Sequence, residues 1–226
     1  MISVKQIQQY PLFFGLSDEA LENLSNILTK HTFAKNAYIY YPGNTGLNLY
    51  LVESGMVRLF MINSKGVEFL LNLARPRTVF GLPGLLSQEV RPAGAAALQT
   101  TIVLTMSRAD LFHFVDTYPQ FTRNLLIEMS SNLRTLLEHT QALASLSLNG
   151  RLAALILNMV KNWETPADKL ELELPLTQTD LASWVGASRG RVNRELNKMQ
   201  QLGLIKVEGT MLKITDLPGL GNLSKS

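Results

Sequence analysis

The chain has 226 residues, which is long enough for two domains that each bury an apolar core. Apolar residues make up 46% of the sequence and charged residues 17%, a composition that excludes an intrinsically disordered chain. Cysteine is absent, so disulfides, thiolate zinc sites, cysteine nucleophiles and cysteine-ligated iron–sulfur clusters are excluded. No segment matches a membrane helix or a secretory signal, and we therefore expect a cytoplasmic protein without membrane contact.

The net charge is only +3, but its excess lies in one segment. Residues 186–213 contain six cations and two anions, so this segment alone carries +4 and the rest of the chain is close to neutral. A basic patch on a near-neutral body is the electrostatic footprint of nucleic-acid binding, although a solvated basic face has the same composition.

Residues 1–30 are predicted to form short helices, because Ser17 is a suitable N-cap for the amphipathic run that ends at Leu28. From Phe33 to Met106 short alternating segments are separated by glycine-containing turns. This spacing indicates an antiparallel β-barrel or jelly roll.

From about Pro119 the apolar period becomes helical. One set of positions recurs at steps of three and four residues, as in a coiled-coil seam: Leu126, Met129, Leu133, Leu136, Thr140 and Leu143. We favour a symmetric dimer contact along this seam over a helix that lies on its own domain. Leu125, Ile127 and Leu137 flank the seam and are expected to pack on the barrel, and Ser145–Gly150 is a candidate hinge.

The C-terminal part begins with a predicted helix at Arg151–Trp163, which Thr165-Pro166 ends. Leu170, Leu172 and Leu174 alternate with glutamates, which predicts a strand that Pro175 stops. A hairpin is expected around Glu208-Gly209, and the tail Leu217–Ser226 is expected to be loose.

A helix-turn-helix is the strongest local prediction. Thr177 and Asp180 have capping-box spacing, Leu181 and Val185 form a buried face, and Gly186 allows a tight turn before Ser188 caps the next helix. In that second helix three apolar residues face inward (Val192, Leu196 and Met199) and five others face outward (Arg189, Gly190, Asn193, Arg194 and Asn197). Such a helix presents its N-terminal residues to base edges in the major groove, whereas the alternative is a helical hairpin with a solvated basic face. Hydroxyls at the helix starts and a nearby lysine are candidate phosphate contacts: Thr177, Thr179, Ser188 and Lys198.

These motifs resemble the C-terminal signature of the cyclic-AMP receptor protein / fumarate-nitrate regulator (Crp–Fnr) superfamily of bacterial transcription regulators. The resemblance rests on Leu176–Ala182, Gly186–Arg189 and Val192–Leu196, and it extends to Pro11–Ser17, to Gly43, Gly55 and Gly66, to Phe80-Gly81 and to the junction at Asn149-Gly150-Arg151. It implies an α+β protein with an effector-sensing antiparallel β jelly roll of the cyclic-nucleotide-binding type (1–117), a dimerisation helix (118–147) and a winged helix-turn-helix domain (148–226).

By this resemblance Arg189 and Arg194 are base-reading arginines. The family usually has a glutamate where this chain has Gly190, so one base preference is relaxed or passes to Arg191 or Asn193. The resemblance further implies a homodimer on a pseudo-palindromic promoter operator, with half-sites roughly 34–36 Å apart, and contact with RNA polymerase. Activation and repression are both compatible with the sequence.

The cyclic-nucleotide cassette of the family is incomplete here. Leu82 follows Gly81 where the family has a glutamate for the ribose, and Pro92 follows Arg91 where it has a serine or threonine for the phosphate. The purine-reading polar pair falls at Leu136 and Leu137. Without these polar partners the binding of cyclic AMP is disfavoured, because each polar group of the ligand that is buried without a hydrogen bond costs about 1–3 kcal/mol of binding free energy. Arg91 is left as either an anion site, with Leu82, Leu136 and Leu137 as an apolar wall, or a surface arginine. We expect an effector other than cyclic AMP between the barrel and the dimerisation helix, in a pocket formed by Gly81, Leu82, Arg91, Pro92, Leu136 and Leu137.

No cofactor is required by the sequence, and the effector is not identified by it. Haem binding is disfavoured, because the three histidines (His31, His113 and His139) have no metal-ligand spacing. Among them, His139 on the dimerisation helix is the least implausible axial ligand. No catalytic or metal-binding constellation is present, and Gly81–Gly84 is interpreted as a barrel turn, so we expect a protein that is not an enzyme. Two alternatives are a constitutive DNA-binding protein with an empty sensor and a ligand-binding module that regulates a protein partner.

Overall fold

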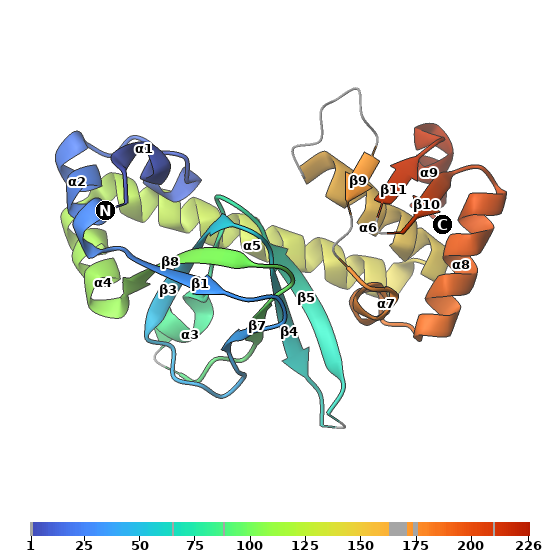
Figure 1. Cartoon of the computed structure of the whole chain (residues 1–226), viewed down its shortest axis with the longest axis horizontal. Helices are drawn as coiled ribbons and strands as arrows, with labels where there is room; N and C mark the ends of the chain where they lie inside the picture. The colour runs from blue at the N-terminus through green and yellow to red at the C-terminus, as the bar shows by residue number, and fades with distance from the viewer. Residues whose placement is uncertain (1, 65, 88, 163–170, 174–175, 210) are drawn as a thin grey trace. The chain divides into compact units, whose positions relative to one another are not determined.

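The computed structural model describes residues 2–64, 66–87, 89–162, 171–173, 176–209 and 211–226 (Figure 1). The chain divides into two compact units, Met1–Arg134 and Thr135–Ser226. Helix α5, Pro119–Ser145, begins in the first unit and ends in the second. The predicted domain limits at 117 and 147 are close to the ends of this helix, and they stay a prediction. No helix of the described part has the length and apolar character needed to cross a membrane.

Two antiparallel four-stranded sheets form the barrel of the first unit, as the jelly-roll prediction requires. One sheet has the order β1 (Thr29–Phe33), β8 (Thr101–Ser107), β3 (Asn48–Ser54), β6 (Val79–Phe80). The other has the order β2 (Tyr38–Tyr40), β7 (Gly94–Ala97), β4 (Val57–Ile62), β5 (Glu68–Ala74). Along β3, Leu49 and Leu51 are fully buried while Asn48 and Tyr50 beside them are only partly buried, which is the period-two pattern of a strand that faces the core on one side.

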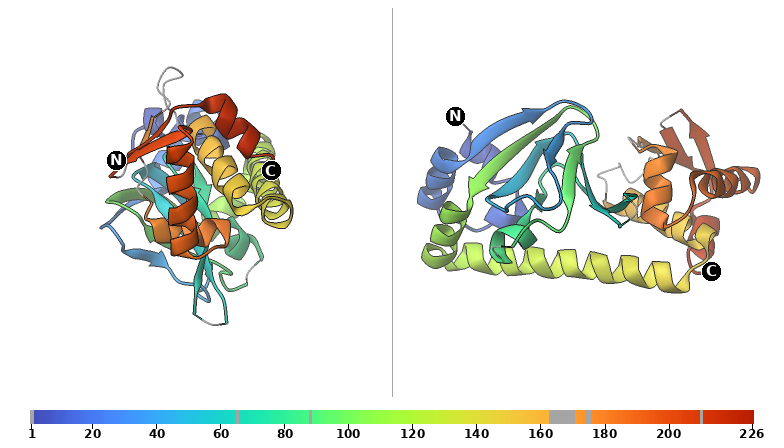
Figure 2. Two further views of the ribbon diagram at one scale, coloured as in Figure 1. Left: turned by 90° about the vertical axis from the view of Figure 1, so that its right-hand side faces the viewer. Right: turned by 90° about the horizontal axis from the view of Figure 1, so that it is seen from below.

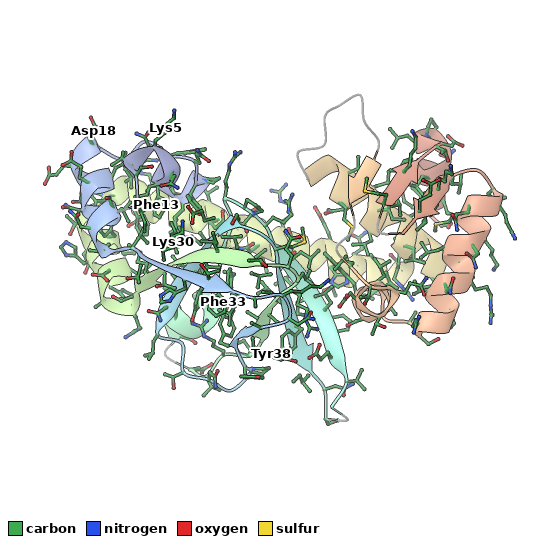
Figure 3. All side chains as sticks on the ribbon, viewed as in Figure 1. Lys5, Phe13, Asp18, Lys30, Phe33 and Tyr38 are labelled. Atoms are coloured by element: carbon green, nitrogen blue, oxygen red, sulfur yellow. The ribbon has the colours of Figure 1, made fainter. Side chains whose placement is uncertain are left out.

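Short helices cover one end of this barrel (Figure 1). They are α1 (Val4–Ile7), a 3₁₀ turn (Pro11–Phe13), α2 (Asp18–Ile27) and α4 (Arg108–Thr117). The hydroxyl of Ser17 accepts a hydrogen bond from the backbone N–H of Ala20, which confirms the predicted cap. Phe13, labelled in Figure 3, stacks on Phe121 with ring centroids 6.1 Å apart and joins this end to α5.

Two local predictions in this unit are corrected by the structure. The region expected to be helical up to residue 30 already forms strand β1 from Thr29, because β1 pairs with β8 along its whole length. The segment Gly81–Gly84 is the start of helix α3, Leu82–Ser87, and not a simple turn. Gly81 has φ +92°, a conformation that glycine adopts without strain, and it precedes that helix.

The outer face of α5 is apolar and exposed. Leu125 is buried, but Ile127 is 67% exposed and Leu137 is also exposed, so the prediction that all three pack on the barrel is wrong for the latter two. Five of the six predicted seam residues are exposed: Leu126, Met129, Leu133, Leu136 and Thr140. The sixth, Leu143, is partly buried.

The second unit contains helices and a three-stranded sheet in the order β10-β11-β9. Its elements after α5 are α6 (Leu148–Asn162), β9 (Glu171–Glu173), α7 (Gln178–Val185), α8 (Arg189–Gln201), β10 (Ile205–Glu208), β11 (Met211–Ile214) and α9 (Leu217–Leu223). This arrangement is a winged helix-turn-helix, in which β10 and β11 form the predicted hairpin (Figure 2). Trp163, Thr165-Pro166, Leu170, Leu174 and Pro175 lie outside the described residues.

The tail predicted to be loose is largely helical. Asp216 caps α9 by accepting from the N–H of Gly219 at 2.9 Å, and Leu220 is fully buried. The backbone carbonyl of Ser226 accepts from the N–H of Ser147 at 3.0 Å, between α5 and α6. The predicted hinge is therefore a two-residue break at Leu146 and Ser147 that the tail contacts directly.

Candidate nucleic-acid interface

The start of α7 is held by a complete capping box. The backbone N–H of Thr177 donates to Oδ2 of Asp180 at 2.8 Å, and the N–H of Asp180 donates to the Thr177 hydroxyl at 3.1 Å. This reciprocal pair satisfies two backbone donors that a helix start otherwise leaves unpaired. The capping box therefore defines where α7 begins, whereas a separate signal defines where it ends.

The turn between α7 and α8 has the predicted geometry. Gly186 has φ +65°, and the N–H of Ala187 donates to the carbonyl of Ala182 at 2.9 Å, as in a left-handed helix C-cap. Val185 is buried on the α7 side of the turn, and Val192 is completely buried on the α8 side. The two helices lie side by side, and both also pack against α6.

Helix α8 separates an inner apolar face from an outer basic face. Leu196 and Met199 are buried together with Val192, whereas all four base-reading candidates are exposed: Arg189, Arg191, Asn193 and Arg194. Among the residues that the structure describes, no carboxylate forms an ion pair with any of these three arginines. Their guanidinium groups are therefore available to a ligand outside the chain.

The four candidate phosphate contacts differ in whether their side chains already bind another group of the described chain. Ser188 is the N-cap of α8, but its hydroxyl makes no capping hydrogen bond, and Thr179 is exposed in the first turn of α7. The hydroxyl of Thr177 donates to Asp180 at 2.7 Å, and Nζ of Lys198 lies 2.9 Å from Oε1 of Glu195. A phosphate could bind the hydroxyls of Ser188 and Thr179 directly. To bind it, Thr177 would have to release Asp180, and Lys198 would have to release Glu195.

A side chain that the sequence did not single out joins α8 to the wing. The Oε1 atom of Gln200 accepts from the backbone N–H of Val207 at 3.0 Å. This bond connects the end of α8 to strand β10, which carries the exposed Lys206. A lone glutamine near a helix end has no distinctive sequence pattern, so nothing in the sequence pointed to it.

The incomplete cassette lies between β6 and β7. Leu82 is buried and Pro92 is exposed, at the two positions where the family pattern has polar residues. Arg91 is only 3% exposed, so the alternative of a surface arginine is wrong. Leu136 and Leu137, two further residues of the predicted effector pocket, are exposed on α5.

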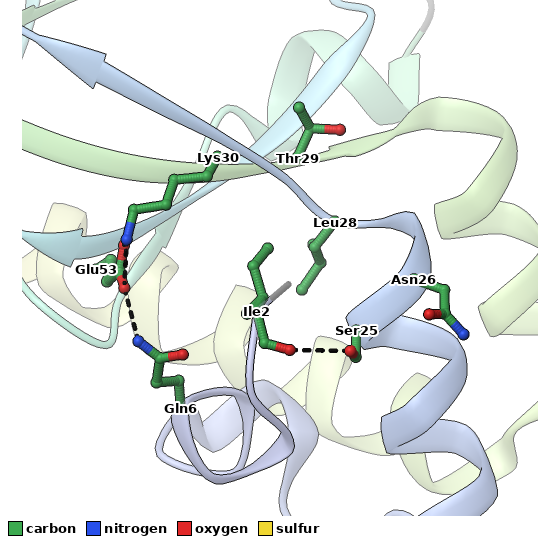
Figure 4. A pocket seen from close by; sticks show the side chains of 8 residues that line it. All are labelled: Ile2, Gln6, Ser25, Asn26, Leu28, Thr29, Lys30 and Glu53. Atoms are coloured by element: carbon green, nitrogen blue, oxygen red, sulfur yellow. Dashed lines mark hydrogen bonds and ion pairs between the residues drawn. The ribbon is translucent and has the colours of Figure 1, made fainter.

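A separate shallow hollow of about 410 Å³ lies among α1, α2, β1 and β3 (Figure 4). Its charged groups already pair with each other: Lys30 Nζ lies 2.7 Å from Oε2 of Glu53, and Nε2 of Gln6 donates to Oε1 of the same carboxylate at 2.9 Å. This hollow is therefore a poor match for a charged ligand.

The histidines do not gather. In the described part of the chain no three metal-ligating side chains come together, and Nε2 of His139 lies 3.0 Å from the carbonyl oxygen of Trp184. That nitrogen, which a haem iron would need, is engaged in a contact between α5 and α7 within the second unit.

Comparison with known proteins agrees with this architecture. A model of the cyclic nucleotide-binding domain matches residues 30–118, and a model of the Crp-like helix-turn-helix domain matches residues 150–223. The first match coincides with the barrel and the second with the winged helix, and together they span well over half of the chain.

Relatives and solved structures match over nearly the full length. An "Anaerobic regulatory protein" of Haemophilus influenzae is 27% identical over 96% of this chain and 85% of its own length. The "Cyclic AMP receptor protein" of Thermus thermophilus is 28% identical over 87% and 88%. The structure of FixK2 from Bradyrhizobium japonicum covers 88% of this chain and 98% of its own with a TM-score of 0.81 at 23% identity.

A transcriptional regulator of the CRP/FNR family from Thermus thermophilus is 25% identical, with a TM-score of 0.72 over 88% of this chain and 99% of its own. The relatives are regulators, which confirms the expectation that this chain is not an enzyme. The two matched domains, in this order and joined by a long helix, place the chain in the Crp–Fnr superfamily of DNA-binding transcription regulators.

Proposed function

We propose that this regulator binds a pseudo-palindromic promoter operator as a homodimer, with Arg189 and Arg194 reading base edges. The observation that carries the proposal is the outer face of α8, where three arginines are exposed and unpaired within the described chain. A guanidinium group can donate two hydrogen bonds to O6 and N7 of guanine, and each such pair discriminates by about 1–3 kcal/mol. The hydroxyls of Ser188 and Thr179 at two helix starts suit adjacent phosphates.

The exposed stripe on α5 supports the homodimer. Leu133 is 58% exposed and has seam neighbours of the same kind one helical turn before and after it. A contiguous apolar stripe in water is unfavourable by roughly 25 cal/mol per Å², and a second copy of the same helix covers it by knobs-into-holes packing. Two reading helices related by a twofold axis then meet two half-sites.

The barrel senses a small molecule other than cyclic AMP in this proposal. The positions of Leu82 and Pro92 lack the polar groups that a cyclic phosphate and a ribose need, and proline also lacks a backbone donor. The effector acts by binding one pose of the reading heads more tightly than another. By resemblance to the family, the bound dimer contacts RNA polymerase.

Substitution Arg194→Ala tests the base-reading role. On an operator obtained by binding-site selection, the variant loses about 5- to 150-fold in specific affinity, while non-specific affinity falls far less. Arg123→Ala, which removes an exposed arginine from α5, is the matched control and leaves operator affinity unchanged. Unchanged specific affinity for Arg194→Ala contradicts the assignment.

The same assay separates the two alternatives. Retention on DNA that falls steeply with salt excludes a module that acts on a protein partner alone, because phosphate contacts release counterions. Identical operator footprints with and without cell extract favour a constitutive DNA-binding protein whose barrel is a scaffold.

A further inference from the structure

Arg91 is a buried cation without an acidic partner. It is 3% exposed, and among the described residues no carboxylate forms an ion pair with it. Removing a charge from water is costly unless other groups replace the lost hydration. The groups that do so here belong to the barrel itself.

Two backbone carbonyls accept hydrogen bonds from the guanidinium. Nη1 donates to the carbonyl of Gly81 at 3.1 Å, and Nη2 donates to the carbonyl of Asn48 at 2.7 Å. Asn48 begins β3, and Gly81 follows β6, its neighbour in the same sheet. The head of Arg91 is thus anchored to one sheet of the barrel.

Aromatic rings complete the surroundings. The guanidinium carbon lies 4.0 Å from the ring centroid of Tyr40 and 5.3 Å from that of Tyr50. Tyr50 stacks on Phe80 at 5.0 Å, and Tyr40 lies 6.1 Å from the same ring. Such faces attract a cation, most strongly when water is excluded. Tyr40 belongs to the second sheet, so the guanidinium bridges both sheets.

The backbone around Arg91 is shaped to hold it. Its N–H donates to the carbonyl of Asn44, and its carbonyl accepts from the N–H of Gly43, both at 2.8 Å. A Cβ at Gly81 would lie 2.8 Å from Nη1, so a larger residue there would displace the guanidinium. Burial raises the pKa of Tyr40 to about 12, and the adjacent cation acts in the opposite direction.

We propose that the carbonyls of Asn48 and Gly81 and the rings of Tyr40 and Tyr50 form a guanidinium-binding cage. Its resident ligand is Arg91 itself. An anion that used this arginine would have to reach a guanidinium that is only 3% exposed and already held by two carbonyls and two aromatic faces. The cage therefore holds the two sheets together without any added ligand. One consequence rests on the proposed function: the effector of this regulator is not an anion bound by Arg91.

Chemical rescue of Arg91→Ala tests the cage on the full chain. The variant unfolds roughly 5–10 °C below the wild type, because the cage loses its cation. Millimolar methylguanidinium restores at least half of that loss, whereas methylammonium, which lacks the planar fork, does not. The measurement contains no DNA, so its result is independent of whether the protein reads an operator.

Arg58→Ala is the matched control. Arg58 also lies over a ring of the barrel, that of Phe60 at 4.8 Å, but it pairs with Glu68 at a partly exposed site. Its removal gives a smaller loss and no selective rescue, because water reaches the site. Equal rescue by both cations, no loss in Arg91→Ala, or stabilisation of the wild type by inorganic phosphate that Arg91→Ala abolishes would each overturn the proposal.

Nitrogen-detected NMR of the wild-type arginines covers the case in which Arg91→Ala does not fold. One guanidinium has ring-current-shifted, slowly exchanging protons whose positions do not change with phosphate. A phosphate titration that moves those signals overturns the cage.

Discussion

At the scale of single residues, the proposed base-reading face of α8 has a glycine where the family usually has a glutamate. Gly190 stands in the first turn of α8, and a Cβ placed there would meet no atom within 4 Å. A side chain can therefore be added without a clash, and it would extend from the exposed basic face. Glycine in a helix also costs about 0.8–1 kcal/mol relative to alanine.

Gly190→Glu is expected to fold with unchanged or slightly higher stability and to narrow the preference at one base pair of each half-site. The carboxylate can accept a hydrogen bond from the N4 amino group of cytosine, which glycine cannot. Binding-site selection on the two proteins measures the change. Identical base frequencies at every position would mean that residue 190 does not face the groove.

Tyr40 gives a second prediction at this scale, in alkaline solution. Its pKa is raised to about 12 in the folded chain, chiefly by burial, from the ordinary value of 10.0. The folded state therefore holds this proton more tightly than the unfolded state, and the contribution of Tyr40 to stability is complete below pH 10 and is lost as the pH rises toward 12. Two pKa units correspond to at most about 3 kcal/mol.

Tyr40→Phe should therefore flatten the fall of the unfolding free energy between pH 10 and 12, as measured by urea titration at several pH values. Tyr10, whose pKa is also raised by burial, remains in the variant and keeps part of the slope. An unchanged slope would show that Tyr40 does not ionise on unfolding in this range.

At the scale of elements, helix α5 has two exposed apolar positions that serve as test and control. Leu133 lies on the seam and Ile127 lies beside it, and both are more than half exposed. Leu133→Gln is expected to weaken the dimer, because a seam leucine buries most of its side chain in a partner and loses about 2 kcal/mol when replaced by a polar group.

Sedimentation of the two variants measures this effect. Ile127→Gln removes a similar apolar area from the chain's surface but leaves the seam intact, so its dimer should be as stable as that of the wild type. If both substitutions weaken the dimer equally, the contact is broader than the heptad seam. If neither does, the stripe serves another purpose.

The same elements explain what the sequence could and could not predict. Period and caps identified α2, α5, α7, α8 and the wing, because each has a local signal: Ser17, a repeat of three and four, the Thr177 capping box, Gly186, and the hairpin glycine. Helix α9 was missed because Pro and Gly in Leu217–Ser226 are typical of a loose tail. Its stability comes from Leu220 packed in the core and from the Asp216 cap.

Arg91 was out of reach of local reasoning for a related reason. Its hydrogen-bond partner Asn48 lies 43 residues away, and its aromatic neighbours Tyr40 and Tyr50 come from two strands, one in each sheet. No spacing rule links such positions, since the barrel topology alone brings them together. The family pattern identified Arg91 as a residue of interest. Only the three-dimensional structure shows that its guanidinium points into the barrel.

At the scale of the whole molecule, the symmetry of the proposed homodimer determines the geometry of the operator that it would bind. In that dimer a twofold axis between two α5 helices would relate two copies of α8, and each would enter the major groove on the same side of the duplex. Their half-site centres are then roughly 34–36 Å apart, one turn of B-DNA. The spacing of the half-sites matters in this proposal, because protein contacts and not the DNA would set the distance between the two α8 helices.

Inserting about five base pairs between the half-sites of a selected operator turns one of them to the opposite side of the duplex, since a turn is about 10–10.5 base pairs. The affinity of the dimer should then fall toward the non-specific level, typically by 10³-fold or more at moderate salt. Inserting a full turn returns the half-sites to the same side of the duplex but farther apart, so the affinity should recover only as far as the DNA can bend to bring them closer. Electrophoretic retention of the purified chain on the three operators measures this. Equal affinity for all three would mean that each reading head binds alone, and that the seam of α5 does not set the distance between them.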